Sequence, residues 1–260
     1  MHSEILLPPD LLERLSGVRS VGAITGAGVS AESGIPTYRG RGGIYDDPEA
    51  GDRTVEALSG HTLRDDPDRT WRAVAELGRH AEHAEPGAGH RALSGIEARV
   101  ERFVLLTQNV DGLHQLAGTR NVIDIHGSVF ATVCMGCRAT DRISRAALAT
   151  LERSPRCESC GGTVRPDVVL FGEMLPMDKI ERILLELVGD PPDLLIVAGT
   201  SALFPYITDP VMSAIRRGRI TVEVNPERTN LSREVAFALS GTAGEYLPAI
   251  ESALPDAAGH

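Results

Sequence analysis

Short continuous apolar runs, each ending at a small or polar residue, limit the folds open to this chain of 260 residues. Continuous rather than alternating runs are typical of strands buried on both faces of a parallel sheet. Segments of helical periodicity lie between them, which predicts a doubly wound α/β fold. We expect strands at residues 21–25, 103–107, 122–125, 194–198 and 220–224. We expect helices at residues 8–15, 68–81, 89–98, 178–188, 210–217 and 245–254.

Two stretches interrupt this alternation. Residues 37–90 are rich in Gly, Pro and charge and hold one helical pattern and no predicted strand, so we expect a loop and a small helical module there. Residues 127–165 hold all four cysteines and are predicted to form a second insert. The sheet domain is then discontinuous and consists of residues 1–36, 91–126 and 166–260.

The composition excludes some classes of partner. Asp and Glu outnumber Lys and Arg by 36 to 26, so no basic face is expected to displace the counterions of a nucleic acid. No apolar stretch approaches the roughly 20 residues that a membrane span needs, and the first residues lack a basic region followed by a long apolar one. We therefore expect a cytoplasmic protein without membrane or direct nucleic-acid partners.

The motif GAGVSAESGIPTYRG follows the first predicted strand. Gly26, Gly28 and Ala31 match the G-x-G-x-x-G/A pattern, in which glycines allow a tight turn and a close approach to a pyrophosphate. A glycine-rich strand-to-helix turn without a ligand is the alternative. Gly34 and Pro36 shorten the following helix, so an ordinary dehydrogenase half is not expected. The rest of the motif is predicted to be a loop that closes over the nicotinamide end of a dinucleotide.

Polar side chains follow two further predicted strands, at the sheet edge where ligands bind in open α/β folds. In TQNVDGLH, Asn109 and Asp111 are predicted to hold a carboxamide and a ribose hydroxyl, and the alternative is an Asx turn that caps a helix. His126 follows the next strand. A neutral imidazole there can accept a proton at physiological pH, so His126 is predicted to be a general base. The other histidines, including His90 and His114, are expected to be structural or solvated.

The later strands end in similar residues. Gly199, Thr200 and Ser201 suit a phosphate or ribose, and Asn225 suits ribose hydroxyls. Either Thr242 or Ala243 is expected to contact an adenine. The segment RPDVVLFGE, residues 165–173, is predicted to be a short strand. It is either an exposed edge that pairs with an extended peptide or an ordinary core strand.

The cysteines form two pairs, Cys134-x2-Cys137 and Cys157-x2-Cys160. This spacing predicts one tetrahedral Zn²⁺ in a ribbon-like module, with a redox pair as the alternative. Four thiolates leave no open coordination position, so the ion is expected to be structural.

The chain contains, in this order, GAGVSAESGIPTYRG, TQNVDGLH, HGS, the two C-x-x-C pairs, VVLFGE, GTS and the strand before Asn225. In order and spacing, these motifs resemble those of the sirtuin family, the NAD-dependent protein-lysine deacylases. The resemblance extends from about residue 18 to residue 253. It implies a Rossmann-like NAD domain, a small zinc domain and an acyl-lysine substrate bound between them. It also implies that the substrate amide oxygen attacks the nicotinamide ribose, nicotinamide leaves, and His126 deprotonates a ribose hydroxyl so that the acyl group moves to ADP-ribose.

The resemblance also implies roles for individual residues. Asn109 and Asp111 join His126 as catalytic residues, and Tyr38 with Arg39 shields the reactive centre. The residues expected to contact NAD are Gly26, Ala27, Gly28, Ser30, Ala31, Pro36, Thr37, Tyr38, Arg39, Gln108, Asn109, Val110, Asp111, Gly199, Thr200, Ser201, Asn225 and Ala243. The residues expected to bind the peptide are Val168, Val169, Phe171, Gly172 and Glu173.

The chain departs from the family pattern in its expected acyl pocket. The glycine-rich motif looks like that of a branch whose members often remove succinyl or malonyl groups with a Tyr-x-x-Arg pair, but Val74 and Leu77 align there. Without a guanidinium, a buried acyl carboxylate would be poorly solvated, so we predict removal of acetyl or other uncharged groups. Arg72 or Arg79 replaces the missing arginine only if the helix register differs.

Two other functions fit parts of the pattern. A mono-ADP-ribosyltransferase or NAD glycohydrolase would use the same scaffold and consume NAD without an acyl-lysine. A binding module that reads NAD or acylated tails would need no base, so the set of Asn109, Asp111 and His126 argues against it.

Overall fold

The computed structural model describes residues 6–37, 43 and 47–256, and most of their strands form one parallel sheet. The strands of this sheet are β1 (Ser20–Thr25), β2 (Arg102–Thr107), β3 (Val122–Asp124), β7 (Leu194–Ala198), β8 (Ile220–Val224) and β9 (Phe237–Leu239). They lie in the order β3-β2-β1-β7-β8-β9. This is the doubly wound arrangement, in which the strand order reverses between β1 and β7. The predicted fold class is confirmed.

The sheet register brings the turns after several strands together. Thr25, the last residue of β1, pairs with Thr107 on one side and Ala198 on the other. The segments that leave β1, β2 and β7 therefore start side by side at one sheet edge, as the sequence predicts. The edge strand β9 was not predicted, because three residues carry too little hydrophobic pattern to identify a strand.

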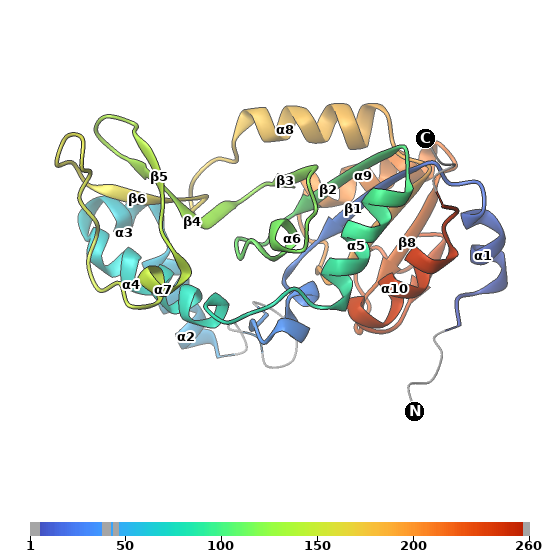
Figure 1. Ribbon diagram of the computed structural model, residues 1–260, viewed down its shortest axis with the longest axis horizontal. Coiled ribbons are helices and arrows are strands. Elements are labelled where there is room, and N and C mark those ends of the chain that lie inside the picture. The colour runs from blue at the N-terminus through green and yellow to red at the C-terminus, as the bar shows by residue number, and fades with distance from the viewer. Residues whose placement is uncertain (1–5, 38–42, 44–46, 257–260) are drawn as a thin grey trace.

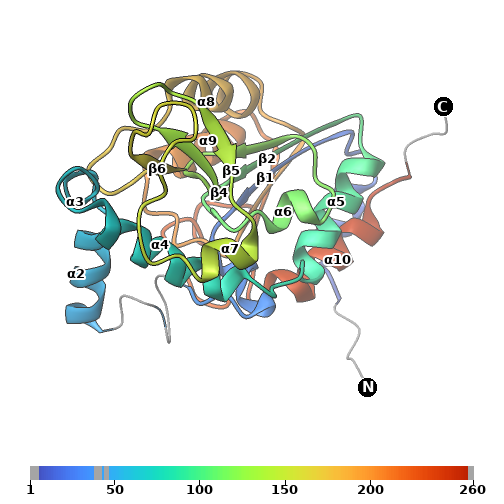
Figure 2. The same ribbon diagram turned by 60° about the vertical axis from the view of Figure 1, so that its left-hand side comes forward.

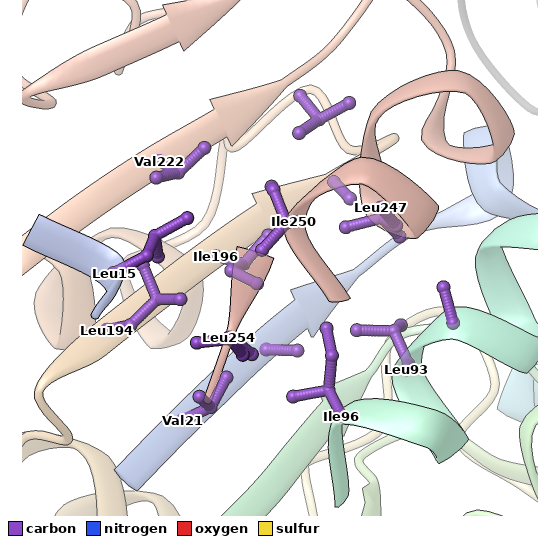
Figure 3. Close-up of a cluster of buried hydrophobic side chains, with 14 of the residues drawn as sticks. Leu15, Val21, Leu93, Ile96, Leu194, Ile196, Val222, Leu247, Ile250 and Leu254 are labelled. Carbon is purple, nitrogen blue, oxygen red and sulfur yellow. The ribbon is translucent and has the colours of Figure 1, made fainter. Parts of the chain in front are cut away.

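Helices cover both faces of this sheet. On one face lie α1 (Pro9–Leu15), α5 (Ala88–Arg99) and α10 (Ala243–Ala253). Figure 3 shows this core, where Leu93 and Ile96 of α5 lie near Leu247 and Ile250 of α10. On the other face lie α8 (Met177–Ile183), the π-helix η4 (Leu184–Gly189) and α9 (Pro205–Arg216). The predicted start of α9 at residue 210 is wrong, because Pro205 occupies the first helical turn, where proline is tolerated.

The helical module contains more helices than the single one predicted. Before α4 (Pro67–Ala81) lie α2 (Pro48–Ala57) and α3 (Gly60–Asp65), which are short and bury few apolar side chains, so the sequence shows no clear apolar stripe there. Asp47, Ser59 and Asp66 accept hydrogen bonds from the first turns of these helices and so fix their starts. None of the helices in the described part of the chain is long and apolar enough to cross a bilayer.

A small antiparallel sheet packs against this module. It consists of β4 (Gly127–Cys134), β5 (Thr140–Arg142) and β6 (Val164–Val168), in the order β5-β4-β6. The short helix α7 (Arg145–Ala149) lies between β5 and β6 in the sequence. Trp71 of α4 is fully buried beneath it and donates from Nε1 to the Val164 carbonyl at 2.8 Å. Figure 1 shows the small sheet with α3 and α4 at one end of the molecule and α5, α10 and α1 at the other, and Figure 2 brings the small sheet forward.

The predicted domain boundary at residue 165 falls within β6. Because β6 pairs with β4 through Val164, Arg165 and Pro166 as well as its last residues, the whole strand lies in the small sheet. It is the edge strand of that sheet, which excludes the alternative of a strand inside a sheet core.

Candidate active site

A cavity of about 1030 Å³ lies at the sheet edge where the turns after β1, β2, β7 and β8 meet. Its size is at the upper end of the range for small-molecule sites. The site residues predicted from the sequence that line it are Gly26, Ala27, Gly28, Ala31, Thr37, Gln108, Asn109, Val110, His126, Val168, Val169, Phe171, Gly172, Glu173, Gly199, Thr200, Ser201, Asn225 and Ala243.

The remaining predicted residues lie beside the cavity or outside the described part of the chain. Ser30, Pro36 and Asp111 line a smaller adjoining cavity. The two cavities share Ala27, Leu77, Asn109, Val110 and Val129. The predictions for Tyr38 and Arg39 concern residues outside the described ranges.

The glycine-rich turn packs directly on the turn after β7. The Gly28 N–H donates to the Gly199 carbonyl at 2.9 Å. A Cβ on Gly28 would lie 2.7 Å from the Gly199 Cα, and one on Gly26 would lie 2.8 Å from the Gly199 oxygen. Only glycine permits this approach, so both turns present backbone and small side chains to the cavity. This surface and the polar groups of Thr200 and Asn225 fit a dinucleotide.

Two one-turn helices follow in place of a long helix, as Gly34 and Pro36 predict. They are η1 (Ala27–Val29) and η2 (Ala31–Ser33), and η2 ends at Gly34, which has a left-handed φ of 81°.

Ser30 connects the two residues of the N-x-D motif. Its hydroxyl accepts from Asn109 Nδ2 at 3.0 Å and donates to Asp111 Oδ2 at 2.7 Å. Asp111 Oδ1 accepts from the Leu113 N–H at 2.9 Å, at the start of α6 (Leu113–Leu116). Asp111 therefore forms the Asx turn considered as an alternative and also orients Ser30, while Asn109 keeps its carbonyl oxygen available to a ligand.

Two buried histidines support this arrangement from behind. His90 Nδ1 accepts from the Gly87 N–H at 3.1 Å, so Nε2 carries the proton and faces Ser30 Oγ at 3.4 Å. His114 Nε2 bonds to Thr25 Oγ1 at 2.9 Å, and the two imidazole rings lie 4.7 Å apart. Burial lowers the pKa of both rings, so both are neutral at physiological pH. The structural role expected for these histidines agrees with these contacts, but nothing in the sequence spacing connects His90 with Ser30.

His126 projects into the cavity from the turn between β3 and β4. Its Nδ1 lies 2.9 Å from the Gln108 carbonyl oxygen, which can only accept, so Nδ1 carries the proton and Nε2 is the basic atom of the neutral ring. Burial lowers the pKa of His126, the bond to Gln108 opposes that shift, and the ammonium of Lys179 adds to it. The ring is therefore neutral and able to accept a proton at pH 7.

The segment after β6 forms one wall of the cavity, although not as the predicted continuous strand. The strand ends at Val168, and the Val169 N–H then donates to the His126 carbonyl at 2.9 Å. Phe171 exchanges backbone hydrogen bonds with Leu58 and Gly60, at 2.9 and 3.1 Å. These bonds to the helical module replace sheet pairing, so the predicted strand is wrong beyond Val168.

One end of the cavity is apolar. Val74 and Leu77, one turn apart on α4, both line it, as the alignment with the Tyr-x-x-Arg pair predicts. The surrounding cavity residues are Leu58, Val110, Val129 and Leu170. Arg79 donates to the Ala149 carbonyl at 3.3 Å, and Arg72 is 54% exposed near Asp66. Neither arginine is among the residues that line the cavity.

The four cysteines form a compact cluster at the tip of the small sheet. Their Sγ atoms lie within 4.8 Å of one another, with Cys134 and Cys160 at 3.5 Å and Cys137 and Cys157 at 3.6 Å. A tetrahedral ion with Zn–S bonds of about 2.3 Å has sulfur atoms about 3.8 Å apart, so the cluster fits zinc. Backbone N–H groups, above all that of Cys137, lower the pKa of Cys134 to about 6, which favours the thiolate that a metal binds.

The cavity also contains residues that the sequence analysis did not single out. Residues 226–230 follow Asn225 directly. The rule that ligands bind at strand ends predicts them as site residues if it is applied to the whole turn after the strand. Leu203, Phe204 and Tyr206 carry no such signal, because they lie between GTS and the helix predicted at residues 210–217. The full set is Glu32, Leu58, Val129, Leu170, Leu175, Leu203, Phe204, Tyr206, Val224, Pro226, Glu227, Arg228, Thr229 and Asn230. Thr242, predicted as the alternative to Ala243 for an adenine contact, also lines the cavity.

Comparisons with known proteins agree with this geometry. The family model described as the Sir2 family matches residues 26–204. The chain is 41% identical to NAD-dependent protein deacylase 2 of Pseudomonas aeruginosa, over 96% of this chain and 97% of the relative. It is 37% identical to NAD-dependent protein deacylase 1 of Archaeoglobus fulgidus, over 91% and 94%.

Solved structures show the same likeness. A Sir2 homologue in complex with NAD superimposes with a TM-score of 0.83 at 35% identity, over 97% of this chain and 95% of that one. A Sir2 variant with a deacetylated p53 peptide and 3′-O-acetyl ADP-ribose has a TM-score of 0.80 at 27% identity, over 94% and 96%. By its fold, its cavity and these matches, the chain belongs to the Sir2 family.

Proposed function

We propose that this NAD-dependent protein deacylase removes acetyl and other uncharged acyl groups from lysine side chains of proteins. The acyl group is transferred to ADP-ribose and nicotinamide is released. One observation carries the proposal: a single cavity holds the strand-end residues His126 and Asn109 together with the apolar end formed by Val74 and Leu77.

The strand-end turns are proposed to bind NAD. The backbone around Gly26 and Gly28 faces the pyrophosphate, and Thr200 and Asn225 reach the ribose farther from the nicotinamide. Asn109, oriented by Ser30, offers its carbonyl oxygen to the nicotinamide end. NAD supplies a ribose carbon from which nicotinamide departs. The bonds among Ser30, Asn109 and Asp111 hold these groups in place before the ligand binds, which lowers the entropic cost of reaching a reactive geometry.

His126 is proposed to be the general base. Its Nδ1 proton is held by the Gln108 carbonyl, so Nε2 is oriented toward the cavity and is the atom that becomes protonated when a ribose hydroxyl loses its proton. Burial keeps the ring neutral and ready for this step.

The acyl-lysine protein is proposed to enter along Val168–Gly172. Phe171 is 42% exposed there, and Leu203 and Phe204, which line the same cavity, are 49% and 46% exposed. Exposed apolar residues that line one cavity are typical of a surface that accepts a partner. The acyl group then points toward Val74 and Leu77. Neither Arg72 nor Arg79 lines the cavity, so among the described residues α4 offers no guanidinium to pair with a charged acyl group.

The remaining assignments follow from the same organisation. We propose that the sheet domain binds NAD, that the two inserts complete the substrate cleft, and that a zinc ion on Cys134, Cys137, Cys157 and Cys160 stabilises the small sheet. Unpaired thiols clustered in this way suit a reducing cytoplasm.

A panel of otherwise identical peptides with acetyl-, propionyl-, butyryl-, succinyl- and malonyl-lysine tests the proposal. Mass spectrometry with and without NAD should show NAD-dependent loss of the uncharged groups and little loss of the acidic ones. Rapid desuccinylation with poor deacetylation would contradict the acyl preference. NAD consumption that is equally fast without any peptide would favour an NAD glycohydrolase or an ADP-ribosyltransferase.

A further inference from the structure

Tyr206 contacts the atom of His126 that the proposed reaction uses. Its hydroxyl oxygen lies 3.1 Å from His126 Nε2, and the two rings meet edge to face with centroids 6.0 Å apart. Phe204 stacks on the tyrosine ring, with ring centroids 5.5 Å apart and an interplanar angle of 10°. Tyr206 lies in the first turn of α9 and lines the cavity, so packing fixes the hydroxyl beside the base.

The hydrogen-bond directions around His126 are determined by its partners. The Gln108 carbonyl holds the Nδ1 proton, so Nε2 of the neutral ring offers one lone pair. Tyr206 must then donate its hydroxyl proton to Nε2. A hydroxyl of an incoming ribose cannot bond to the same lone pair at the same time. It can instead donate to the oxygen of Tyr206, which has a free acceptor position.

We propose that Tyr206 is a catalytic residue that relays the proton from the ribose hydroxyl to His126. The inference rests on the proposed function, in which His126 is the base. As the ribose O–H bond breaks, a new O–H bond forms on Tyr206, and the original proton of Tyr206 moves to Nε2. The tyrosine therefore ends as it began, the ribose oxygen keeps the electron pair, and the imidazole becomes a cation.

The surroundings of the hydroxyl fit both stages of this relay. Burial raises the pKa of Tyr206 to about 12, so the phenol keeps a proton to donate at neutral pH. Once Nε2 carries a proton, it becomes the donor and the tyrosine oxygen accepts. The tyrosine proton can then turn to Gln108 Oε1, which lies 3.5 Å away. Gln108 is itself held by a 2.7 Å bond from its Nε2 to Thr200 Oγ1.

The test compares Tyr206→Phe with the matched control Tyr246→Phe, which removes a hydroxyl from α10 outside the cavity. With an acetyl-lysine peptide, Tyr206→Phe should lower kcat for deacetylation roughly ten- to a hundredfold, the cost of losing a hydrogen bond to a charged group. Exchange of labelled nicotinamide into NAD precedes the base step and should stay within about twofold. Tyr246→Phe should match the wild type in both assays.

A second measurement uses the protein without NAD or peptide. In ¹⁵N-histidine NMR spectra, the Nε2 resonance of His126 should move toward that of a free imidazole nitrogen in Tyr206→Phe and stay unchanged in Tyr246→Phe. In a His126→Ala background, Tyr206→Phe should cause no further loss of deacetylation, because the two residues act in one step.

The outcomes separate the relay from other roles. An unchanged deacetylation rate in Tyr206→Phe, or an unchanged Nε2 resonance, overturns the proposal. A faster variant with a lower KM for NAD also overturns it, since the hydroxyl would then obstruct the ribose. A wild-type protein that removes no acyl group contradicts the proposed function instead, while the NMR result still reports on the contact between Tyr206 and His126.

Discussion

Arg165 and Glu173 form a two-point ion pair that closes residues 168–173, the segment proposed to bind the peptide, into a fixed loop. Arg165 Nη1 and Nη2 donate to Glu173 Oε1 and Oε2, each at 2.7 Å. Nη2 also donates to the Val168 carbonyl at 2.8 Å, and Oε2 accepts from the Leu170 N–H at 3.0 Å. The two side chains are only 20% and 25% exposed, so the pair is well shielded. Glu173, predicted to bind the peptide, thus has its carboxylate committed to the loop itself.

Breaking this pair should weaken peptide binding more than it slows the reaction. In Arg165→Met, the loop from Val168 to Glu173 loses its clamp, and we expect the KM for the peptide to rise about tenfold, equivalent to about 1.4 kcal/mol. The kcat and the KM for NAD should change by less than about threefold. Steady-state kinetics would measure this, with Arg156→Met as the control, since Arg156 is exposed in the same small module. Equal effects on the KM values for peptide and NAD would show a general disruption instead.

The preference for uncharged over acidic acyl groups should depend on residues 74 and 77 of α4. In the double variant Val74→Tyr, Leu77→Arg, a guanidinium inside the cavity can pair with an acyl carboxylate. We expect kcat/KM for succinyl-lysine to rise at least about tenfold and that for acetyl-lysine to fall. Because Val74 is fully buried, the larger tyrosine will strain the core, so Leu77→Arg alone should be measured beside it. Arg72→Met serves as the control on the same helix. Fast desuccinylation by the wild type would refute the assignment.

Removal of the zinc ion should unfold the small sheet, but it should not remove any of the residues proposed to react in the cavity. Cys157→Ser should reduce bound zinc from about one ion per chain to nearly none, because three thiolates and a hydroxyl bind far more weakly. Elemental analysis measures the zinc, and thermal unfolding should show a lower Tm. A chelated protein that melts at the wild-type temperature would mean that the cysteine cluster has no structural role.

Much of this fold was predictable because each buried strand carries its own signal. The continuous apolar runs of β1, β2, β7 and β8 identify the parallel sheet, and the rule that ligands bind at carboxyl ends then places Asn109 and His126 near one another. The C-x-x-C pairs identify the metal cluster from spacing alone.

The rest depends on contacts between distant segments. The backbone of Phe171 bonds to Leu58 and Gly60, which lie more than a hundred residues away in the sequence. The sequence pattern around Phe171 predicts a strand, but the sheet does not continue there. His90 reaches Ser30 only through the packing of α5. Tyr206 meets His126 because α9 starts earlier than its periodicity indicates. None of these pairs leaves a pattern in a single sequence.

The pH dependence of deacetylation should report on His126. The base acts when neutral, and its pKa lies below the ordinary value of about 6.5, mainly through burial. The rate should therefore be level near pH 7 and fall only as pH drops below about 6.5, where the imidazole becomes protonated.

Substitution of a single lysine tests the direction in which the pKa of His126 is shifted. Lys179, the only lysine of the chain, donates to Asp124 at 2.7 Å and lowers the pKa of His126. Lys179→Met removes this cation, so the pKa of His126 should rise and the pH at which the rate falls should move to higher pH. The exposed Arg216→Met is the control. If the rate instead falls at a lower pH in Lys179→Met than in the wild type, the ammonium of Lys179 does not lower the pKa of His126.

The most direct test of the central claim, that His126 accepts the ribose proton in a preformed cavity, is acyl transfer by His126→Ala. Its NAD affinity and nicotinamide exchange should stay within about threefold of wild type, while deacetylation should fall by about a hundredfold or more. The exposed His83→Ala should behave as the wild type. Normal deacetylation by His126→Ala would contradict the claim.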